Sequence, residues 1–196
     1  MTLAPAAQAA PPAAHEIWQE FHWAFFLDAQ GLLLALGRFE HFLDGGDLAR
    51  AEAELDAAAV LMEASGAAMR LAASFPRAAY QHEIRGTMAP PHVRSDRFSG
   101  LMSWEHGTLV ALWRRLRPRF ADLPARLGPA HLRFAAAYRD MAGSHVHVCA
   151  RFVGETARSL RYEDRDALRS LRRFGDSRLA LIDPGGTLAG RDGSAS

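Results

Sequence analysis

The residues best suited to chemistry lie in the run Ser144-His-Val-His-Val-Cys-Ala-Arg-Phe-Val-Gly-Glu155, which places two imidazoles and the single thiol of the chain within five residues. In a helix, a rotation of about 100° per residue puts His145 and Cys149 on one face and turns His147 away. In a strand, all three would share a face and could approach a small tetrahedral metal site. The Ala-rich segment upstream repeats its apolar residues every three or four positions and favours helix, so we expect a helix here.

Composition narrows the class of protein. A length of 196 residues fits one domain, and a hydrophobic content of 49% is ample for a core. The net charge of +1 argues against a nucleic-acid partner. No run of 18 uncharged apolar residues occurs and no signal-peptide pattern begins the chain, so we expect a cytoplasmic protein without a membrane partner. A single cysteine cannot form an internal disulfide and is free to bind a ligand, attach covalently or pack.

The residues around this run predict the elements that must position it. Four segments have the apolar spacing of long amphipathic helices. They are His15–Leu43, Leu48 to about Ser74, Leu101–Leu116, and a segment from about Pro129 that carries His145 and Cys149. Gly45-Gly46 ends the first and Asp47 caps the second, whereas Arg117-Pro118 closes the third. The sequence therefore predicts an all-α helical bundle of about four long helices, enclosing the site.

The remaining segments are irregular or short. Residues 1–14 read as a flexible arm, 15–175 as a single helical domain, and 176–196 as a flexible tail. Residues 163–174 predict a short basic helix. Periodicity breaks down between Arg77 and Gly100, which predicts a long ordered loop carrying polar groups, and such loops tend to be functional.

Three groups of residues, taken in order, resemble the tryptophan 2,3-dioxygenases. His22 lies in an aromatic first helix, as the distal-pocket histidine of that family does. Arg85-Gly-Thr-Met-Ala-Pro-Pro followed by Phe98-Ser-Gly resembles its Phe-Arg segment, which ends in Gly-Phe. His145, followed by Arg151 and Gly154, is similar to its haem-ligand helix, His-x-x-x-apolar-x-Arg-apolar-apolar-Gly.

The resemblance extends to a wider superfamily, the haem-dependent aromatic oxygenases. The Gly-rich loop that follows the ligand helix in tryptophan dioxygenases is replaced here by Glu155-Thr-Ala-Arg-Ser-Leu-Arg161, and the chain is shorter. The wider group includes bacterial haem tyrosine hydroxylases of natural-product pathways. Some of these have a His-x-x-x-Cys haem-attachment motif, which His145-Val-His-Val-Cys149 resembles.

This resemblance implies an enzyme and its site. It implies a haem iron held by His145, with the haem either b-type or c-type through Cys149. Arg85 would hold the carboxylate of a small aromatic amino acid with Tyr80 nearby, and His22 would be the distal catalytic group. The implied reaction is hydroxylation or dioxygenation of that amino acid or a close derivative by O₂ or peroxide, in specialised metabolism. A homodimer or larger assembly is expected by the same analogy.

Two other classes of protein also fit the residues alone. One is a haem-binding sensor or carrier without turnover, and the other is a structural-zinc or metal-free helical bundle that binds a partner. In these cases His145 could be a core histidine, Arg85 part of a salt bridge, and Cys149 an inert buried thiol. A Soret band would separate the haem proteins from the haem-free module. A spectral change on adding tyrosine or tryptophan would then separate an enzyme from a carrier.

Overall fold

The computed structural model describes residues 13–88, 103–153 and 167–188, and every regular element in these ranges is a helix. The predicted all-α bundle is therefore confirmed, although the described long helices number five instead of about four. They are α1 (Ala14–Asp44), α2 (Leu48–Ala72), α4 (Trp104–Ala121), α5 (Gly128–Val153) and α6 (Ala167–Ile182), with a short α3 (Arg77–Ala79) after α2. No helix in the described ranges has the length and apolar composition needed to span a membrane.

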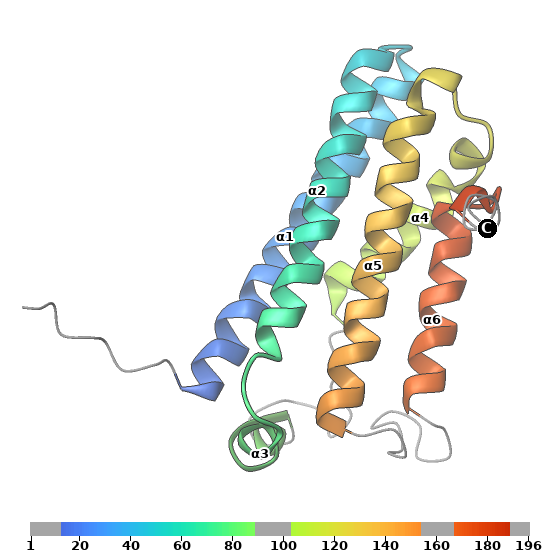
Figure 1. Cartoon of the computed structure of the whole chain (residues 1–196). Coiled ribbons are helices and arrows are strands. Elements are labelled where there is room, and N and C mark those ends of the chain that lie inside the picture. Colours follow the sequence, from blue (N-terminus) through green and yellow to red (C-terminus); the bar gives the residue numbers. More distant parts are fainter. Residues whose placement is uncertain (1–12, 89–102, 154–166, 189–196) are drawn as a thin grey trace, which may run out of the picture.

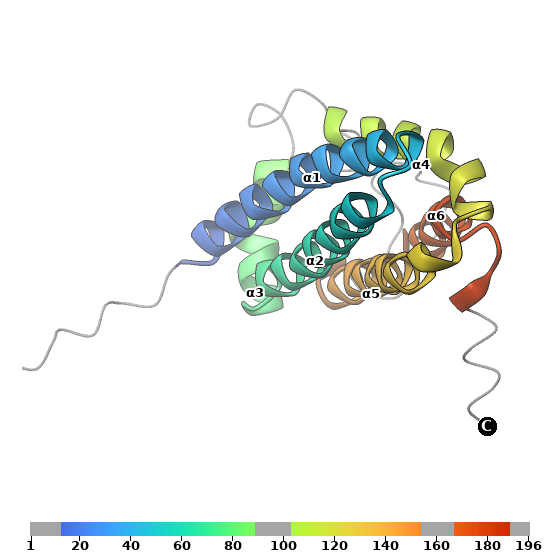
Figure 2. The ribbon, with the colours of Figure 1, turned by 90° about the horizontal axis from the view of Figure 1, so that it is seen from above.

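The long helices form a ring around a shared core. α1 and α2 make an antiparallel hairpin, α2 packs on α5, and α1 packs on α4, while α6 contacts both α4 and α5 (Figures 1 and 2). The largest fully buried side chains of the main core include Phe39, Leu55, Trp113, Leu116 and Phe134. A second, smaller cluster of aromatic and aliphatic residues includes Phe75, Tyr80, Val148 and Phe152. α1 and α5 each contribute buried residues to both clusters, so these two helices join them.

The turn between α1 and α2 follows the sequence signals closely. Gly46 has a φ of 73°, the left-handed conformation that glycine adopts without a steric penalty. The side chain of Asp47 then accepts a hydrogen bond from the backbone N–H of Arg50 at 3.1 Å, which caps α2. The predicted N-cap is confirmed.

The predicted end of the third helix is wrong. α4 continues past Pro118 to Ala121, with the proline inside the helix. The proline removes one backbone hydrogen bond, but the extra turn buries Phe120, whose ring stacks on Phe39 at a centroid distance of 5.9 Å. At the other end, Ser103 caps α4 by accepting from the N–H of His106 at 3.2 Å. The predicted start at Leu101 lies outside the described residues.

The segment predicted as a loop is partly helical. After α3, Tyr80–Ile84 form one π-helical turn and Arg85–Met88 a 3₁₀ turn. Tyr80 and Ile84 are buried in the second cluster, so packing holds the backbone in these turns. Residues 89–102 lie outside the described ranges.

The predicted boundary at residue 175 is also wrong, since α6 runs to Ile182 and the packed chain continues to Leu188. Ile182 is fully buried, and the Asp183 carboxylate fixes the turn that follows. It accepts hydrogen bonds from Thr187 Oγ1 at 2.7 Å, Thr187 N at 3.0 Å and Leu188 N at 3.1 Å. Burial alone would raise the pKa of Asp183, but these bonds outweigh it and hold the pKa below its ordinary value. The predicted arm before residue 13 and the tail beyond 188 lie outside the described residues.

Asp183 gives a test of this correction. We expect Asp183→Ala to lower the free energy of unfolding by about 1–3 kcal/mol, because buried donors lose their acceptor. The exposed Asp122 offers a matched control, and Asp122→Ala should change stability by less than about 0.5 kcal/mol. Urea unfolding followed by circular dichroism measures both. Equal stability of Asp183→Ala and the parent chain would mean that this segment adds nothing to the fold.

Candidate active site

Three histidines from three helices lie close enough for their charges to interact. They are His22 on α1, His106 on α4 and His145 on α5. Burial, together with the charges of His22 and Arg178, lowers the pKa of His145 to about 4. Burial, with the charges of Arg178 and His145, likewise lowers the pKa of His106 to about 4. Both imidazoles are therefore neutral near pH 7, the form that can donate a lone pair to a metal or accept a proton.

The face of α5 predicted from helical spacing is confirmed. His145 and Cys149 are partly buried one turn apart, and His147 is exposed. The alternative strand, with all three residues on one face, is wrong. His145 lies between Tyr138 of the main core and Val148 of the second cluster, at the seam where the two clusters meet on α5.

Two nitrogens of this site have no protein partner among the described residues. The Nε2 atom of His106 is buried and makes no hydrogen bond, and no hydrogen bond links the His145 ring to the described part of the chain. Buried polar atoms are nearly always paired, so an unpaired imidazole nitrogen indicates a position kept for a ligand. In the described ranges, no three His, Cys, Asp or Glu side chains are grouped so that they could hold a metal ion.

His22 is oriented by its own helix. Its Nδ1 lies 2.7 Å from the carbonyl oxygen of Trp18, so Nδ1 must carry the hydrogen and donate it. The neutral ring then has an acceptor lone pair on Nε2. The ring also packs on the Trp18 indole, with 4.1 Å between centroids. Burial lowers the pKa of His22, although the bond to Trp18 opposes this effect.

An aromatic wall stands beside the histidines. Tyr80 stacks on Phe152 with centroids 4.5 Å apart and an interplanar angle of 6°, and Phe75 stacks on the same ring at 5.1 Å. Trp18 meets Tyr80 at 5.6 Å. The wall brings together α1, the turns after α2, and the end of α5. Tyr80 and Phe152 are only 5% and 1% exposed, so the wall is a packed aromatic cluster inside the protein.

Cys149 lies at this wall. Burial raises the pKa of its thiol to about 11, so the sulfur is protonated at neutral pH. Burial also raises the pKa of Tyr80, and a Cys149 thiolate would add to that rise, so the two side chains lie within electrostatic range of each other. In a helix, four residues correspond to about 6 Å of rise, so the thiol lies one turn along from His145.

Arg85 occupies the edge of the site. Its side chain is exposed, and its guanidinium donates to Gln81 Oε1 at 3.1 Å. The amide of Gln81 in turn donates to the backbone oxygen of Phe152 at 2.9 Å. Of the predicted site residues, His22, Tyr80, Cys149 and His145 therefore come together around the aromatic wall. Arg85 is tied to the same wall through Gln81 but faces solvent.

The sequence prediction missed two residues of the site. His106 lies on the inward stripe of α4 with Leu109 and Trp113, so its i, i+3, i+7 spacing could have revealed it. Arg178 is on α6, in the part of the chain that was predicted to be a tail. It is partly buried, donates to the carbonyl oxygen of Phe174 at 3.1 Å, and lies over the Phe174 ring. Its charge acts on both His106 and His145.

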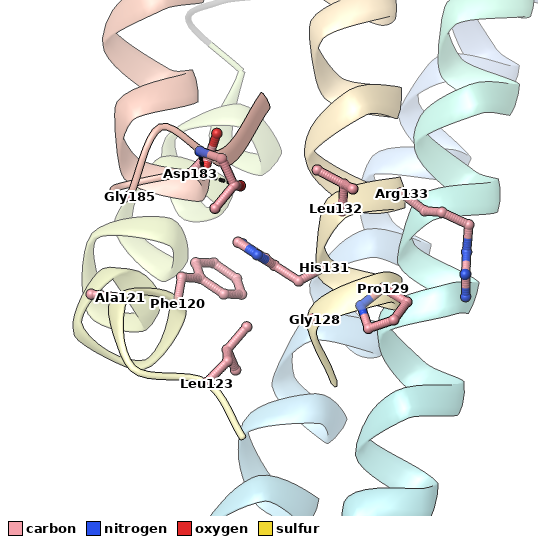
Figure 3. Close-up of a pocket in the computed structure, with 11 residues that line it drawn as sticks. Phe120, Ala121, Leu123, Gly128, Pro129, His131, Leu132, Arg133, Asp183 and Gly185 are labelled. Atoms are coloured by element: carbon pink, nitrogen blue, oxygen red, sulfur yellow. Dashed lines mark hydrogen bonds between the residues drawn. The ribbon is translucent and has the colours of Figure 1, made fainter. Parts of the chain in front are cut away.

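A separate pocket of about 780 Å³ lies where α4 ends and α5 begins (Figure 3). His131 points into it but bonds through Nε2 to the carbonyl oxygen of Ile182 at 2.7 Å, and its ring stacks on Phe120. The Asp183 carboxylate is already used by Thr187 and Leu188. From His131 to His145 is about 21 Å along α5. The ionisable groups of this pocket are therefore used to stabilise the fold. His22, His106 and His145 remain the better candidates for the functional site.

Comparison with known proteins assigns the sequence of this chain to a family. A family model described as SfmD 3-methyl-L-tyrosine peroxygenase matches residues 2–130, about two thirds of the chain. The match includes His22, Tyr80, Arg85 and His106 and ends before His145.

A 3-methyl-L-tyrosine peroxygenase from Streptomyces lavendulae is 33% identical over 162 residues, which are 81% of this chain and 44% of that protein. The chain thus spans less than half the length of this relative. No solved structure matches the chain significantly. Because the family model covers well over half of the sequence, the chain belongs to the SfmD 3-methyl-L-tyrosine peroxygenase family.

Proposed function

We propose that this chain is a haem-dependent peroxygenase that hydroxylates an aromatic amino acid, with 3-methyl-L-tyrosine as the first substrate to test. The observation that carries the proposal is that three histidines with lowered pKa values lie within electrostatic range of one another beside an aromatic wall. The family is named for the same class of reaction. We further propose that this family is part of the haem-dependent aromatic oxygenase superfamily, which the order of His22, Arg85 and His145 resembles.

The described residues fit a haem. A haem iron takes one or two neutral imidazoles, and His145 and His106 each offer a nitrogen with no protein partner. The porphyrin needs apolar surroundings, which the packed rings of Trp18, Tyr80 and Phe152 provide. We therefore assign His145 as the iron ligand and His106 as the second imidazole available to the same iron.

Bound haem would supply the activation of peroxide, while the chain binds and orients the reactants. Insertion of one peroxide oxygen into a ring C–H yields a phenol and one water, so the overall reaction needs no external reductant. Peroxide is favoured over O₂ for this reason and by the name of the family.

His22 is the proposed catalytic group for proton transfer. Its Nδ1 hydrogen is engaged by the Trp18 carbonyl, so Nε2 is left to accept a proton from the oxidant or from the phenol of the substrate. The lowered pKa of His22 keeps this nitrogen unprotonated at neutral pH.

Arg85 and Tyr80 are the proposed substrate-binding residues. The Arg85 guanidinium is exposed at the edge of the wall and can form a charge-assisted pair with an α-carboxylate. The Tyr80 ring, fixed by its stack on Phe152, would then lie alongside the substrate ring.

The proposed function is tested by turnover. The purified chain should show a Soret band, and adding 3-methyl-L-tyrosine with hydrogen peroxide should give a product heavier by one oxygen atom. A Soret band without product or substrate-induced spectral change would indicate a carrier. Absence of haem after expression with a haem precursor would refute the proposal altogether.

The haem ligand is tested by a matched pair of variants on α5. We expect His145→Ala to lose at least about 90% of the haem, because the iron loses its imidazole. His147→Ala should keep the haem content of the parent, since His147 is exposed on the other side of the helix. The pyridine haemochrome spectrum measures both. Equal haem content in the two variants would remove His145 from the site.

The role of Arg85 is tested by substrate binding. Arg85→Leu should weaken the binding of the amino acid by about 1.5–3 kcal/mol, the usual contribution of a hydrogen bond to a charged group. The Soret band of the resting protein should stay unchanged. Arg77→Leu, at another exposed arginine nearby, is the control and should bind as the parent does. Spectral titration gives the dissociation constants. If Arg85→Leu bound the amino acid as tightly as the parent does, Arg85 would not be a substrate-binding residue.

Cys149 is the proposed attachment point of a c-type haem. Its protonated thiol lies one helical turn from His145, so it can reach the edge of a porphyrin held there, and addition of S–H across a vinyl group releases no atom. Denaturing mass spectrometry should show the chain heavier by one haem, and Cys149→Ser should release free haem. A parent chain of unmodified mass would instead indicate a b-type haem, with Cys149 as packing.

A further inference from the structure

An apolar strip runs along exposed positions of α1 and α2, two helices that lie side by side in both views (Figures 1 and 2). On α1 it consists of Trp23, Leu27 and Leu34, with exposed fractions of 61%, 64% and 68%. On α2 it consists of Ala53, Ala57, Val60, Ala64, Ala67 and Leu71. Val60 is 63% exposed and Leu71 46%. Exposed polar residues flank the strip, at Gln30 on α1 and at Glu63 on α2, but its own members are all apolar.

The other long helices present a different surface. Exposed positions of α4, α5 and α6 are occupied repeatedly by arginine. They include Arg114, Arg115, Arg117, Arg133, Arg139, Arg169, Arg172 and Arg173. A helix at the surface of a monomer normally has a polar outer face, and a large exposed apolar patch marks a contact surface. The α1–α2 hairpin has fewer exposed arginines, at Arg38, Arg50 and Arg70, and none of them belongs to the apolar strip.

The spacing of the strip on α2 indicates what covers it. Its residues are separated by 4, 3, 4, 3 and 4 positions, the 3.5-residue period of a seam between two packed helices. The spacing is the same when it is read from either end of α2. Two copies of the stripe can therefore pack antiparallel, with residue 62 at the centre of the pairing. In that pairing Leu71 of one copy faces Ala53 of the other, and Val60 faces Ala64. Each large side chain meets a small one.

We propose that the apolar strip is the interface of a two-fold symmetric dimer, in which α2 of two copies pack antiparallel. A two-fold interface uses the same surface on both subunits, as the reversible spacing requires. The stripe from Ala53 to Leu71 is about 27 Å long. With α1 beside it, the strip is about two helices wide, which brings it within reach of the roughly 800 Å² per partner of a standard interface. The dimer does not depend on the proposed function.

Analytical ultracentrifugation of the full chain tests the interface. The parent should be a dimer, and Ala64→Glu should weaken dimerisation at least about a hundredfold, because two uncompensated carboxylates would be buried per dimer. The control is Ala111→Glu at an exposed alanine of α4, which should dimerise as the parent does. Circular dichroism confirms that each variant is folded. A monomeric parent, or an Ala64→Glu dimer as tight as the parent, overturns the proposal.

Oxidative cross-linking tests the orientation. In the antiparallel pairing residue 57 of one copy faces residue 67 of the other, so the double variant Ala57→Cys/Ala67→Cys should form a disulfide-linked dimer under mild oxidation. Ala57→Cys alone should not, because the two substituted positions lie about 15 Å apart along the helices. The parent, which keeps Cys149, gives the background. Cross-linking of Ala57→Cys alone would indicate a parallel pair and contradict the proposed symmetry.

Discussion

The site depends on the desolvation of imidazoles at the seam between two hydrophobic clusters. α5 crosses from the main core to the aromatic cluster, and His145 lies at the crossing. Water is scarce there, so the charged form of His145 is disfavoured, and the nearby charges of His22 and Arg178 disfavour it too. A neutral histidine without a hydrogen-bond partner costs stability unless a ligand uses it. The fold therefore keeps at this seam a histidine without the protein hydrogen bond that the buried His131 makes to Ile182.

The aromatic cluster gives this position its shape. Trp18 from α1, Tyr80 from the turns after α2 and Phe152 from α5 pack on one another, and each belongs to a different part of the chain. The π-helical turn at Tyr80–Ile84 matters here, because it directs both Tyr80 and Ile84 into the cluster. π-helical turns occur often at functional sites, and this one carries the chain from α2 to Arg85 at the edge of the wall.

Charge is divided between the two sides of the bundle, although the net charge is only +1. Carboxylates of the α1–α2 hairpin meet arginines of the elements that follow, as Glu40 meets Arg115, Glu52 meets Arg126 and Asp56 meets Arg133. These pairs are exposed and each is worth little by itself. Their value lies in fixing which helices are neighbours. The apolar strip on the hairpin takes no part in these pairs, and it is the physical basis of the proposed dimer.

The sequence by itself determined the helices, their approximate ends at Gly45-Gly46 and Asp47, and the shared face of His145 and Cys149 with His147 turned away. These features follow from the 3.6-residue period and from capping, which act between residues close in the chain. Only the tertiary structure decided that α4 runs through Pro118, that α6 extends to Ile182, and that His106 and Arg178 reach His145. Periodicity reports that a side chain faces inward but not what it meets there. The burial that holds a helix past a proline, or lowers the pKa of an imidazole, exists only when separate helices come together.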